Sequence, residues 1–145
     1  MKLTDVWFTA LSEAENGKMV FINGRDQIME FIKSGKFKER AEIYWKYEGD
    51  AKGMPDEPTA KLMEGVQDVL QKAMEKDKLS ILTGVYTGDN ERTLVFITRN
   101  VPAFGERLNS ALANFELLPI TIYTEKDPLN EEYLDMYQMK EAAVE

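Results

Sequence analysis

The segment 38–48 carries the clearest alternation of apolar and polar side chains in the chain, and this pattern constrains the fold more than any other part of the sequence. One face of the alternation carries Ala41, Ile43, Trp45 and Tyr47, and the other carries Glu42, Tyr44, Lys46 and Glu48. Successive side chains of a strand point to opposite faces, so the segment predicts a strand with one buried face. The chain must therefore build a sheet that other elements cover on at least one side.

The elements that follow this strand occur in an order that indicates a fold class. The patterns predict a strand over 38–48, a helix over 58–78, strands over 79–87 and 92–99, a helix over 101–115 and a strand over 118–124. This βαββαβ order is that of the split βαβ, or ferredoxin-like, fold. We therefore expect an α+β protein with a four-stranded antiparallel sheet and two helices on one face. The N-terminal elements would either extend this sheet or cover its other face.

Two further segments flank this core. Strand formers over 6–12 and 18–23 surround the turn-forming pair Asn16-Gly17, which predicts an N-terminal hairpin. Asp26 is placed to cap a short helix that ends near Ser34. Asp127-Pro128 is placed to begin a C-terminal helical segment. No linker or repeat interrupts the pattern, so we expect a single domain over 1–145, with a hairpin and helix extension over 1–37, a core over 38–124 and a helical segment over 125–145.

The two central strands of the predicted core are apolar on both faces. We expect one set of side chains to face the two helices: Leu79, Ile81, Val85, Leu94 and Phe96. A second set points the other way: Leu82, Tyr86, Val95 and Ile97. An apolar second face needs a cover. The N-terminal hairpin with its helix, or a second subunit, would provide it, so a homodimer is one expected assembly.

The composition excludes several classes of function. The chain contains neither histidine nor cysteine, the side chains most often used for catalysis and transition-metal binding near neutral pH. Its 18 basic and 26 acidic residues give a net charge of −8, which opposes the phosphate contacts of a nucleic-acid-binding protein. No apolar run approaches the roughly 20 residues that span a bilayer, and the N-terminus does not resemble a signal peptide. We therefore expect a cytoplasmic protein that binds neither nucleic acid nor membrane.

The acidic residues form two clusters that are candidates for a metal or catalytic site. Glu125, Asp127, Glu131, Glu132 and Asp135 carry the oxygen ligands that hard cations prefer, but their spacing does not match the EF-hand calcium loop. Acidic side chains are also favoured in the first turn of a helix by its dipole. The loop residues Asp50, Asp56 and Glu57 are explained by capping and solvation. We therefore expect no bound metal and no cofactor at these clusters.

The most suggestive polar run is Thr87-Gly88-Asp89-Asn90-Glu91-Arg92. A tight loop with a hydroxyl, a carboxylate and a guanidinium is able to hold a small polar ligand, although the run lacks the other glycines and the lysine of a phosphate-binding loop. A hairpin turn with an arginine salt bridge explains the same residues. Both interpretations stay open at this point.

Several short motifs resemble those of one protein family over nearly the whole chain. They are Trp45 and Tyr47, Gly53-Met54-Pro55, Asp68, Thr83-Gly84-Val85, Thr87-Gly88 before Arg92, Phe96, and Asp127-Pro128 followed by Tyr133. Together they are similar to the bacterial domain-of-unknown-function 695 family. The resemblance implies no activity, because none is established for the family. It does imply an association: the domain can occur beside one that resembles the regulator of ribonuclease E activity B, a small acidic ferredoxin-like inhibitor that acts by protein contact.

Two functional hypotheses follow from the sequence. The first is a non-enzymatic, acidic cytoplasmic domain that binds or regulates a partner protein, with Tyr44, Tyr86, Asp89 and Arg92 as the exposed or loop residues involved. The alternative is a small-molecule-binding protein or a carboxylate-dependent enzyme. In that case Arg92 would hold an anion and Asp89 or Asp127 would act as the base.

Overall fold

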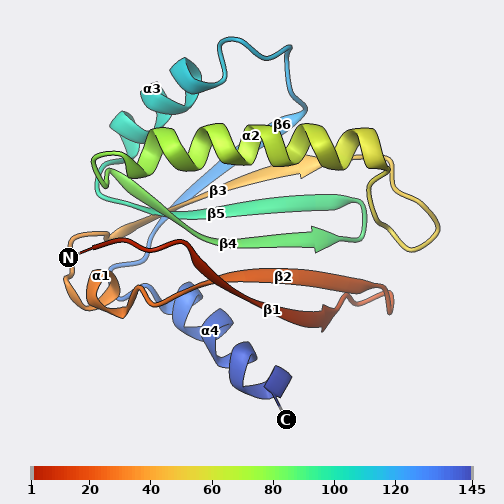
Figure 1. The fold of residues 1–145 in the computed structure, drawn as a ribbon, viewed down its shortest axis with the longest axis horizontal. Coiled ribbons are helices and arrows are strands. Elements are labelled where there is room, and N and C mark those ends of the chain that lie inside the picture. The colour runs from red at the N-terminus through yellow and green to blue at the C-terminus, as the bar shows by residue number, and fades with distance from the viewer. Residues whose placement is uncertain (1, 145) are drawn as a thin grey trace.

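The computed structural model describes residues 2–144, and within them six strands and four helices form one α+β unit (Figure 1). In chain order the elements are β1 (Val6–Glu13), β2 (Met19–Asp26), α1 (Met29–Lys33), β3 (Glu39–Lys46), α2 (Glu57–Glu75), β4 (Ser80–Gly88), β5 (Glu91–Thr98), α3 (Val101–Ala111), β6 (Ile120–Lys126) and α4 (Glu131–Val144). Each predicted strand and helix is therefore present, with bounds that differ by a few residues. None of the helices in the described part of the chain is long and apolar enough to cross a membrane.

All the strands belong to a single antiparallel sheet with the order β1-β2-β4-β5-β3-β6. The predicted four-stranded sheet is therefore extended to six strands by the N-terminal hairpin. The hairpin joins the sheet because β2 pairs with β4, with Phe21 opposite Thr87 and Gly24 opposite Gly84. As a whole, the strand order is not that of a simple ferredoxin fold.

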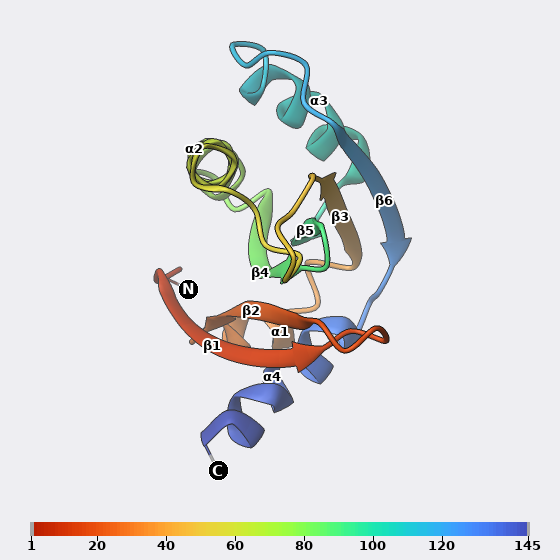
Figure 2. The ribbon, with the colours of Figure 1, turned by 90° about the vertical axis from the view of Figure 1, so that its right-hand side faces the viewer.

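Helices α2 and α3 cover one face of the sheet, as the sequence predicts (Figure 2). The Asp56 side chain caps α2 by accepting the Thr59 N–H, and Asn100 caps α3 by accepting the Ala103 N–H. The core on this face is built from the inward side chains of β3, β4 and β5 and the apolar sides of both helices. Its members include Ala41, Ile43, Trp45, Met63, Val66, Leu70, Leu94, Phe96, Phe104 and Leu108.

A second core lies on the opposite face, where α1 and α4 pack against the sheet (Figure 2). It joins Ala10 and Ile22 of the hairpin, Phe31 of α1, and Tyr133 and Met136 of α4. Phe8 meets Tyr137 edge-on, with ring centroids 5.7 Å apart. Residues of the N-terminal region and of α4 therefore cover the apolar second face. They cover the half of the sheet that contains the hairpin.

The orientation of two side chains in β4 differs from the prediction. Ile81 packs in the second core and Leu82 packs against α2 and α3, the reverse of the expected assignment. A register shift between Leu82 and Gly84 explains the exchange. Because a bulge inserts one residue into the strand, it exchanges the faces of the side chains on one side of it.

The start of α1 also differs from the prediction. Asp26 is the last residue of β2 and does not cap the helix, whose N-cap position is held by Ile28 without a side-chain hydrogen bond. The Asp26 carboxylate instead accepts hydrogen bonds from Tyr137 at 2.9 Å and Lys140 at 2.5 Å. Asp26 therefore fastens α4 to the end of the hairpin.

Candidate functional site

A polar cluster occupies the sheet face that carries α4, beside the first turn of that helix. The alternation of β3 directs Arg40, Glu42 and Tyr44 to this face, while Ala41, Ile43 and Trp45 enter the core on the other side. Side chains from β4, β6 and the start of α4 complete the group. We call these seven residues the Arg40 cluster: Arg40, Glu42, Tyr44, Tyr86, Glu125, Asp127 and Glu132.

The Arg40 guanidinium lies at the centre of this cluster and contacts three carboxylates. It donates to Glu42 at 2.7 Å, to Glu125 at 2.6 Å and to Asp127 at 2.8 Å. Burial disfavours the charged guanidinium, but the hydrogen bonds to Glu42 and Asp127 outweigh this effect and raise the pKa of Arg40. Arg40 therefore stays charged and holds three acidic side chains from β3, β6 and the loop that follows β6.

Two tyrosine hydroxyls bind carboxylates in the same cluster. Tyr44 donates to Glu42 at 2.5 Å, and Tyr86 donates to Glu132 at 2.7 Å. Burial, together with the neighbouring carboxylate, raises the pKa of each tyrosine. Burial also raises the pKa of Glu132. Both hydroxyls therefore remain protonated at neutral pH and serve as hydrogen-bond donors.

Asp127 connects the cluster to α4. Its two carboxylate oxygens accept the backbone N–H groups of Glu131 at 2.9 Å and Glu132 at 3.3 Å. The side chain is only slightly exposed, and it binds Arg40 at the same time. The predicted role of Asp127 at the start of the C-terminal helix is therefore present in the structure, and the ion pair with Arg40 is an additional feature.

The structure brings together three of the five predicted site residues and separates the other two from them. Tyr44, Tyr86 and Asp127 belong to the Arg40 cluster. Asp89 lies in the turn between β4 and β5, where its φ is +50° and its carboxylate accepts the Asn16 amide at 2.8 Å. Asp89 thus ties the β4–β5 turn to the tip of the N-terminal hairpin.

Arg92 lies on the sheet face opposite the Arg40 cluster. It pairs across the strands with Trp45 and Thr87, and its Nε donates to the Thr87 hydroxyl at 2.8 Å. Among the residues described, no carboxylate lies within ion-pair distance of its guanidinium. Burial lowers the pKa of Arg92. The expected hairpin salt bridge is therefore absent from the described residues, and Arg92 and Asp127 are not parts of one site.

Four members of the Arg40 cluster were not among the predicted site residues: Arg40, Glu42, Glu125 and Glu132. The helix dipole favours acidic side chains in the first turn of a helix, and this accounts for Glu132 without a site. The alternation over 38–48 carried the missing signal, because it places Arg40, Glu42 and Tyr44 on one face of a strand.

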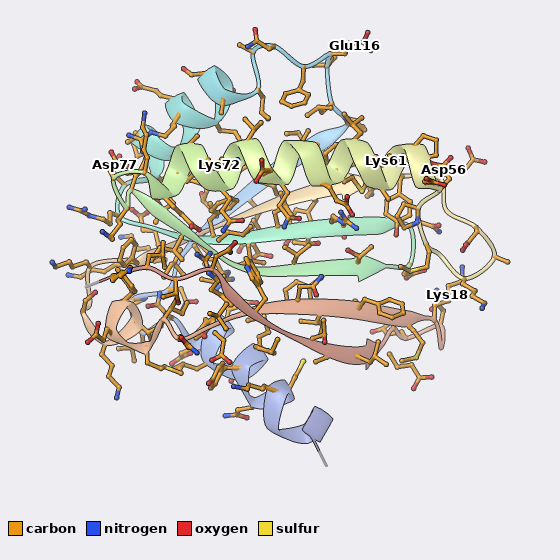
Figure 3. The ribbon with its side chains drawn as sticks, viewed as in Figure 1. Lys18, Asp56, Lys61, Lys72, Asp77 and Glu116 are labelled. Carbon is orange, nitrogen blue, oxygen red and sulfur yellow. The ribbon has the colours of Figure 1, made fainter. Side chains whose placement is uncertain are left out.

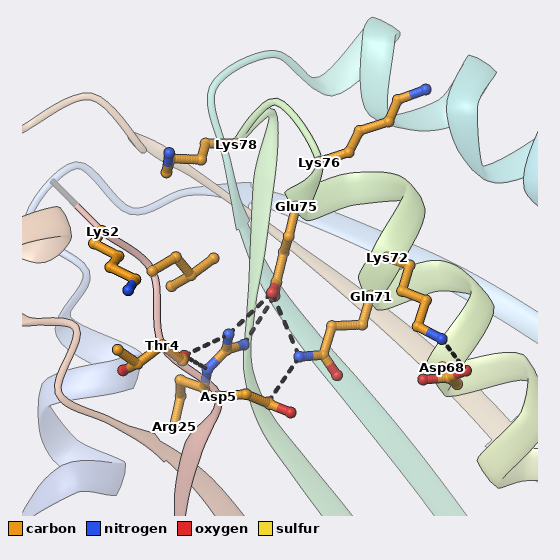
Figure 4. Close-up of a pocket in the computed structure, with 11 residues that line it drawn as sticks. Lys2, Thr4, Asp5, Arg25, Asp68, Gln71, Lys72, Glu75, Lys76 and Lys78 are labelled. Carbon is orange, nitrogen blue, oxygen red and sulfur yellow. Dashed lines mark hydrogen bonds and ion pairs between the residues drawn. The ribbon is translucent and has the colours of Figure 1, made fainter.

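A cavity of about 520 Å³ opens between the N-terminal segment, β2 and the end of α2 (Figure 4). Its lining includes Arg25, Glu75 and four lysines: Lys2, Lys72, Lys76 and Lys78. The buried Arg25 guanidinium binds the Glu75 carboxylate, the Thr4 carbonyl and the Leu82 carbonyl. Its donors are thus satisfied within the chain, so this arginine fastens β2 to α2 and offers no free donor to a ligand.

The acidic side chains of the described residues do not form a cation site. No group of three or more of them has an arrangement that would hold a metal ion within residues 2–144. In the Arg40 cluster the oxygens of Glu42, Glu125 and Asp127 are directed to the guanidinium. The chemistry of the cluster is therefore that of an ion-pair network with excess negative charge.

Comparisons with known proteins identify a family and no individual relative. The profile of a family described as a family of unknown function, DUF695, matches residues 5–137. Neither a curated protein nor a solved structure matches the chain significantly. The match extends from the residue before β1 into α4 and so includes the hairpin, the sheet and the Arg40 cluster. The chain belongs to this family of unknown function, DUF695.

Proposed function

We propose that this protein is a non-enzymatic regulatory or adaptor domain that binds a partner protein through the Arg40 cluster. The partner surface that fits this cluster is basic, with a lysine or arginine side chain at its centre. The contact is electrostatic at its core and aromatic at its margin, where Tyr44 is half-buried beside the cluster.

The observation that supports this proposal is the imbalance of charge around one guanidinium. Arg40 supplies one positive charge, whereas Glu42, Glu125, Asp127 and Glu132 supply four carboxylates. Even with Glu132 protonated, the cluster keeps an excess of negative charge. A cationic side chain from a partner would reduce this excess, and complementary charge both speeds association and selects the partner.

The geometry of the cluster favours such binding for a second reason. Its carboxylates are held by Arg40, Tyr44, Tyr86 and two backbone N–H groups, so little side-chain freedom remains to be lost on association. Glu125 is the most exposed of the acidic partners, with 49% of its side-chain surface accessible. A basic side chain would therefore approach from the Glu125 side.

Affinity capture of the tagged full chain from native host lysate tests this proposal, with quantitative mass spectrometry of the bound proteins at low and high salt. We expect a near-stoichiometric partner that is lost at high salt, because exposed charge contacts are screened. Glu125→Gln removes one charge without changing the size of the side chain, and it should reduce capture of that partner. Tyr44→Phe should reduce it as well, because the phenol would no longer orient Glu42.

The matched control is Glu64→Gln, which makes the same chemical change on the exposed side of α2, on the other face of the sheet. This variant should capture the partner as wild type does. If Glu125→Gln and Glu64→Gln behave alike, the Arg40 cluster does not form the contact. Capture of nothing above background in either salt condition would count against a protein-binding role.

A second candidate function rests on Arg92. A half-buried guanidinium without a carboxylate partner is uncommon, because buried charges are normally paired. The Arg92 Nη groups, which have no carboxylate partner among residues 2–144, would bind a small anion on the α2 side of the sheet. A thermal-shift screen of phosphate and organic acids should then give a ligand-dependent rise in melting temperature that Arg92→Gln abolishes. A screen without any shift would remove this candidate.

Two further features belong to the proposal. We propose that residues 39–126 form a ferredoxin-like core to which the hairpin was added, a view supported by the internal order β4-β5-β3-β6 with antiparallel neighbours and by the position of α2 and α3 on one face. We also propose a cytoplasmic location, since a chain without cysteine needs no oxidising compartment to fold.

A further inference from the structure

The strand β6 forms an exposed edge of the sheet. It pairs with β3 on one side, and it is the terminal strand of the sheet in the described part of the chain. Figure 2 shows β6 at the outer margin of the molecule. In an antiparallel pair, every second residue directs its N–H and C=O groups away from the partner strand. Backbone donors and acceptors of β6 are therefore available to a further strand.

The usual protection of an edge strand is missing along most of β6. Proteins protect such strands with charge, proline or a covering element. Ile120 to Thr124 carry neither charge nor proline, and Glu125 and Lys126 follow only at the end of the strand. The loop 112–119 before β6 contains one charged residue, Glu116, which Figure 3 shows between α3 and β6. An unprotected edge of this kind is a template for pairing with another chain.

The side of β6 that faces α3 is apolar. Ile122 lies on this side and is 47% exposed. It lines a groove of about 440 Å³ together with Leu112, Phe115 and Leu118. Leu117, which is fully exposed, belongs to the same lining. A strand added to β6 would therefore place apolar side chains favourably on the α3 side.

The other side of β6 is acidic. Tyr123 pairs across the strands with Glu42, and Glu125 pairs with Arg40, so both adjoin the Arg40 cluster with its four carboxylates and one guanidinium. Lys126, the one basic residue of β6, alternates to the opposite side. A lysine or arginine on an added strand would pair with Glu125 or lie over the Tyr123 ring. This side of the edge therefore favours basic side chains.

We infer that the partner of the proposed function adds a strand to the sheet at β6. The added segment is extended and alternates, with basic side chains on the side of the Arg40 cluster and apolar side chains on the α3 side. In such an arrangement the backbone hydrogen bonds provide affinity and the alternate side chains provide specificity. The inference rests on the proposed function, to which it adds the conformation and the residue pattern of the partner segment.

Charge favours a basic protein segment as the occupant of this edge. The chain has a net charge of −8, which attracts a basic partner before contact. At the edge itself, Glu116 and Glu125 lie near opposite ends of the exposed surface, and the Arg40 cluster adds further negative charge. An acidic segment, or a second copy of this chain, would meet like charge at each of these places.

Titration of the full chain with a capped octapeptide, in which lysine alternates with valine, tests this inference. When extended, this peptide carries lysine on one face and valine on the other. We expect saturable binding that weakens as the salt concentration rises. A peptide of the same composition, with two lysines followed by two valines in repeat, has no such faces and should bind more weakly. A peptide in which glutamate alternates with valine should not bind.

Hydrogen–deuterium exchange of the complex separates strand addition from a contact of side chains alone. The alternating peptide should slow the exchange of β6 amides and leave those of β1, the other edge strand, unchanged. Ile122→Lys introduces the side chain that natural edge strands use for protection, and it should raise the dissociation constant at least about tenfold. Leu11→Lys makes the same change at an exposed position of β1 and should bind as wild type does.

Several results would overturn the inference: no binding of the alternating peptide, equal binding of the two lysine–valine peptides, or protection of β1 equal to that of β6. The captured complex distinguishes this failure from that of the proposed function. Loss of capture in Glu125→Gln, without protection of β6 amides in the wild-type complex, would overturn strand addition and leave the proposed function intact. Protection of β6 with capture that Glu125→Gln does not change would support strand addition and contradict the role of the Arg40 cluster.

Discussion

Arg25 and Glu75 form a two-bond ion pair between β2 and α2, with nitrogen–oxygen distances of 2.8 and 2.9 Å. Arg25 is 1% exposed, and its guanidinium also stacks on the Trp7 ring at 5.0 Å. The pair connects the N-terminal hairpin to the longest helix across 50 residues of sequence. It makes the hairpin an integral part of the fold, in keeping with its place in the sheet.

Glu75→Gln should strongly destabilise the protein. The substitution leaves a buried guanidinium without its counter-charge, which costs about 3–5 kcal/mol of unfolding free energy. Urea denaturation followed by circular dichroism measures the change. Asp68→Asn, which breaks an exposed ion pair with Lys72 on the same helix, should change the unfolding free energy by less than about 1 kcal/mol. Equal effects of the two variants would show that the Arg25–Glu75 pair does not hold the hairpin in place.

Gly24 is the position in β2 where a side chain is least tolerated. A Cβ atom at this residue would lie 2.2 to 2.6 Å from ring atoms of Phe8, which covers the glycine from the neighbouring strand. Gly24→Ala should therefore displace the Phe8 ring and lower the unfolding free energy by about 1–3 kcal/mol. Gly65→Ala is the contrasting variant. Gly65 lies within α2 with no atom near its Cβ position, and alanine there should raise stability by about 1 kcal/mol. The account of this packing is wrong if Gly24→Ala is neutral.

Glu132 should make the protein less stable as the pH rises through the acidic range. Its pKa is raised above the usual value of 4.5 because the side chain is buried. Between the usual and the raised pKa the folded state binds more protons than the unfolded state, so stability falls with rising pH across that interval and stays lower above it. Glu132→Gln keeps an oxygen for the Tyr86 hydroxyl and removes this titration.

Denaturation at pH 4.5 and at pH 7 tests the prediction for Glu132. The unfolding free energy of Glu132→Gln, taken relative to that of the wild type, should be higher at pH 7 than at pH 4.5. Glu131→Gln, at the neighbouring exposed position, should show no such difference. A relative stability of Glu132→Gln that is the same at both pH values would contradict the predicted effect of burial on Glu132.

Local sequence patterns predicted the elements well because their causes are local. The alternation of residues 38–48 marked β3, Asn100 marked the start of α3, and Asn16-Gly17 marked the hairpin turn. The place of the hairpin in the sheet has no such signal. It depends on the pairing of Asn23 and Gly24 with Val85 and Gly84, and neither asparagine nor glycine has a high strand propensity. The sequence pattern also did not predict that Ile81 and Leu82 exchange faces of the sheet. The prediction relied on the two-residue period of a strand, and the bulge in β4 breaks this period.

The candidate site was predictable in part for the same reason. Tyr44 and Tyr86 were identified from exposed positions on strands, and Asp127 from its place before a helix. Their meeting point was not predictable, because the separation of Arg40 and Asp127 is 87 residues and only the sheet order brings them together. The sequence places Arg92 and Asp127 in one hypothetical site, but the alternation of strand faces separates them in the structure.

Hydroxyl-radical footprinting of the protein alone and in its captured complex tests the central claim most directly. The method reports the accessibility of individual side chains, and the chain offers a matched pair of half-buried tyrosines on β3 and the residue that follows it. Tyr44 lies in the Arg40 cluster, and Tyr47 packs against the core under α2 and α3. The account predicts that binding lowers modification of Tyr44 and leaves Tyr47 unchanged. Unchanged modification of Tyr44, with protection of Tyr47, would contradict it.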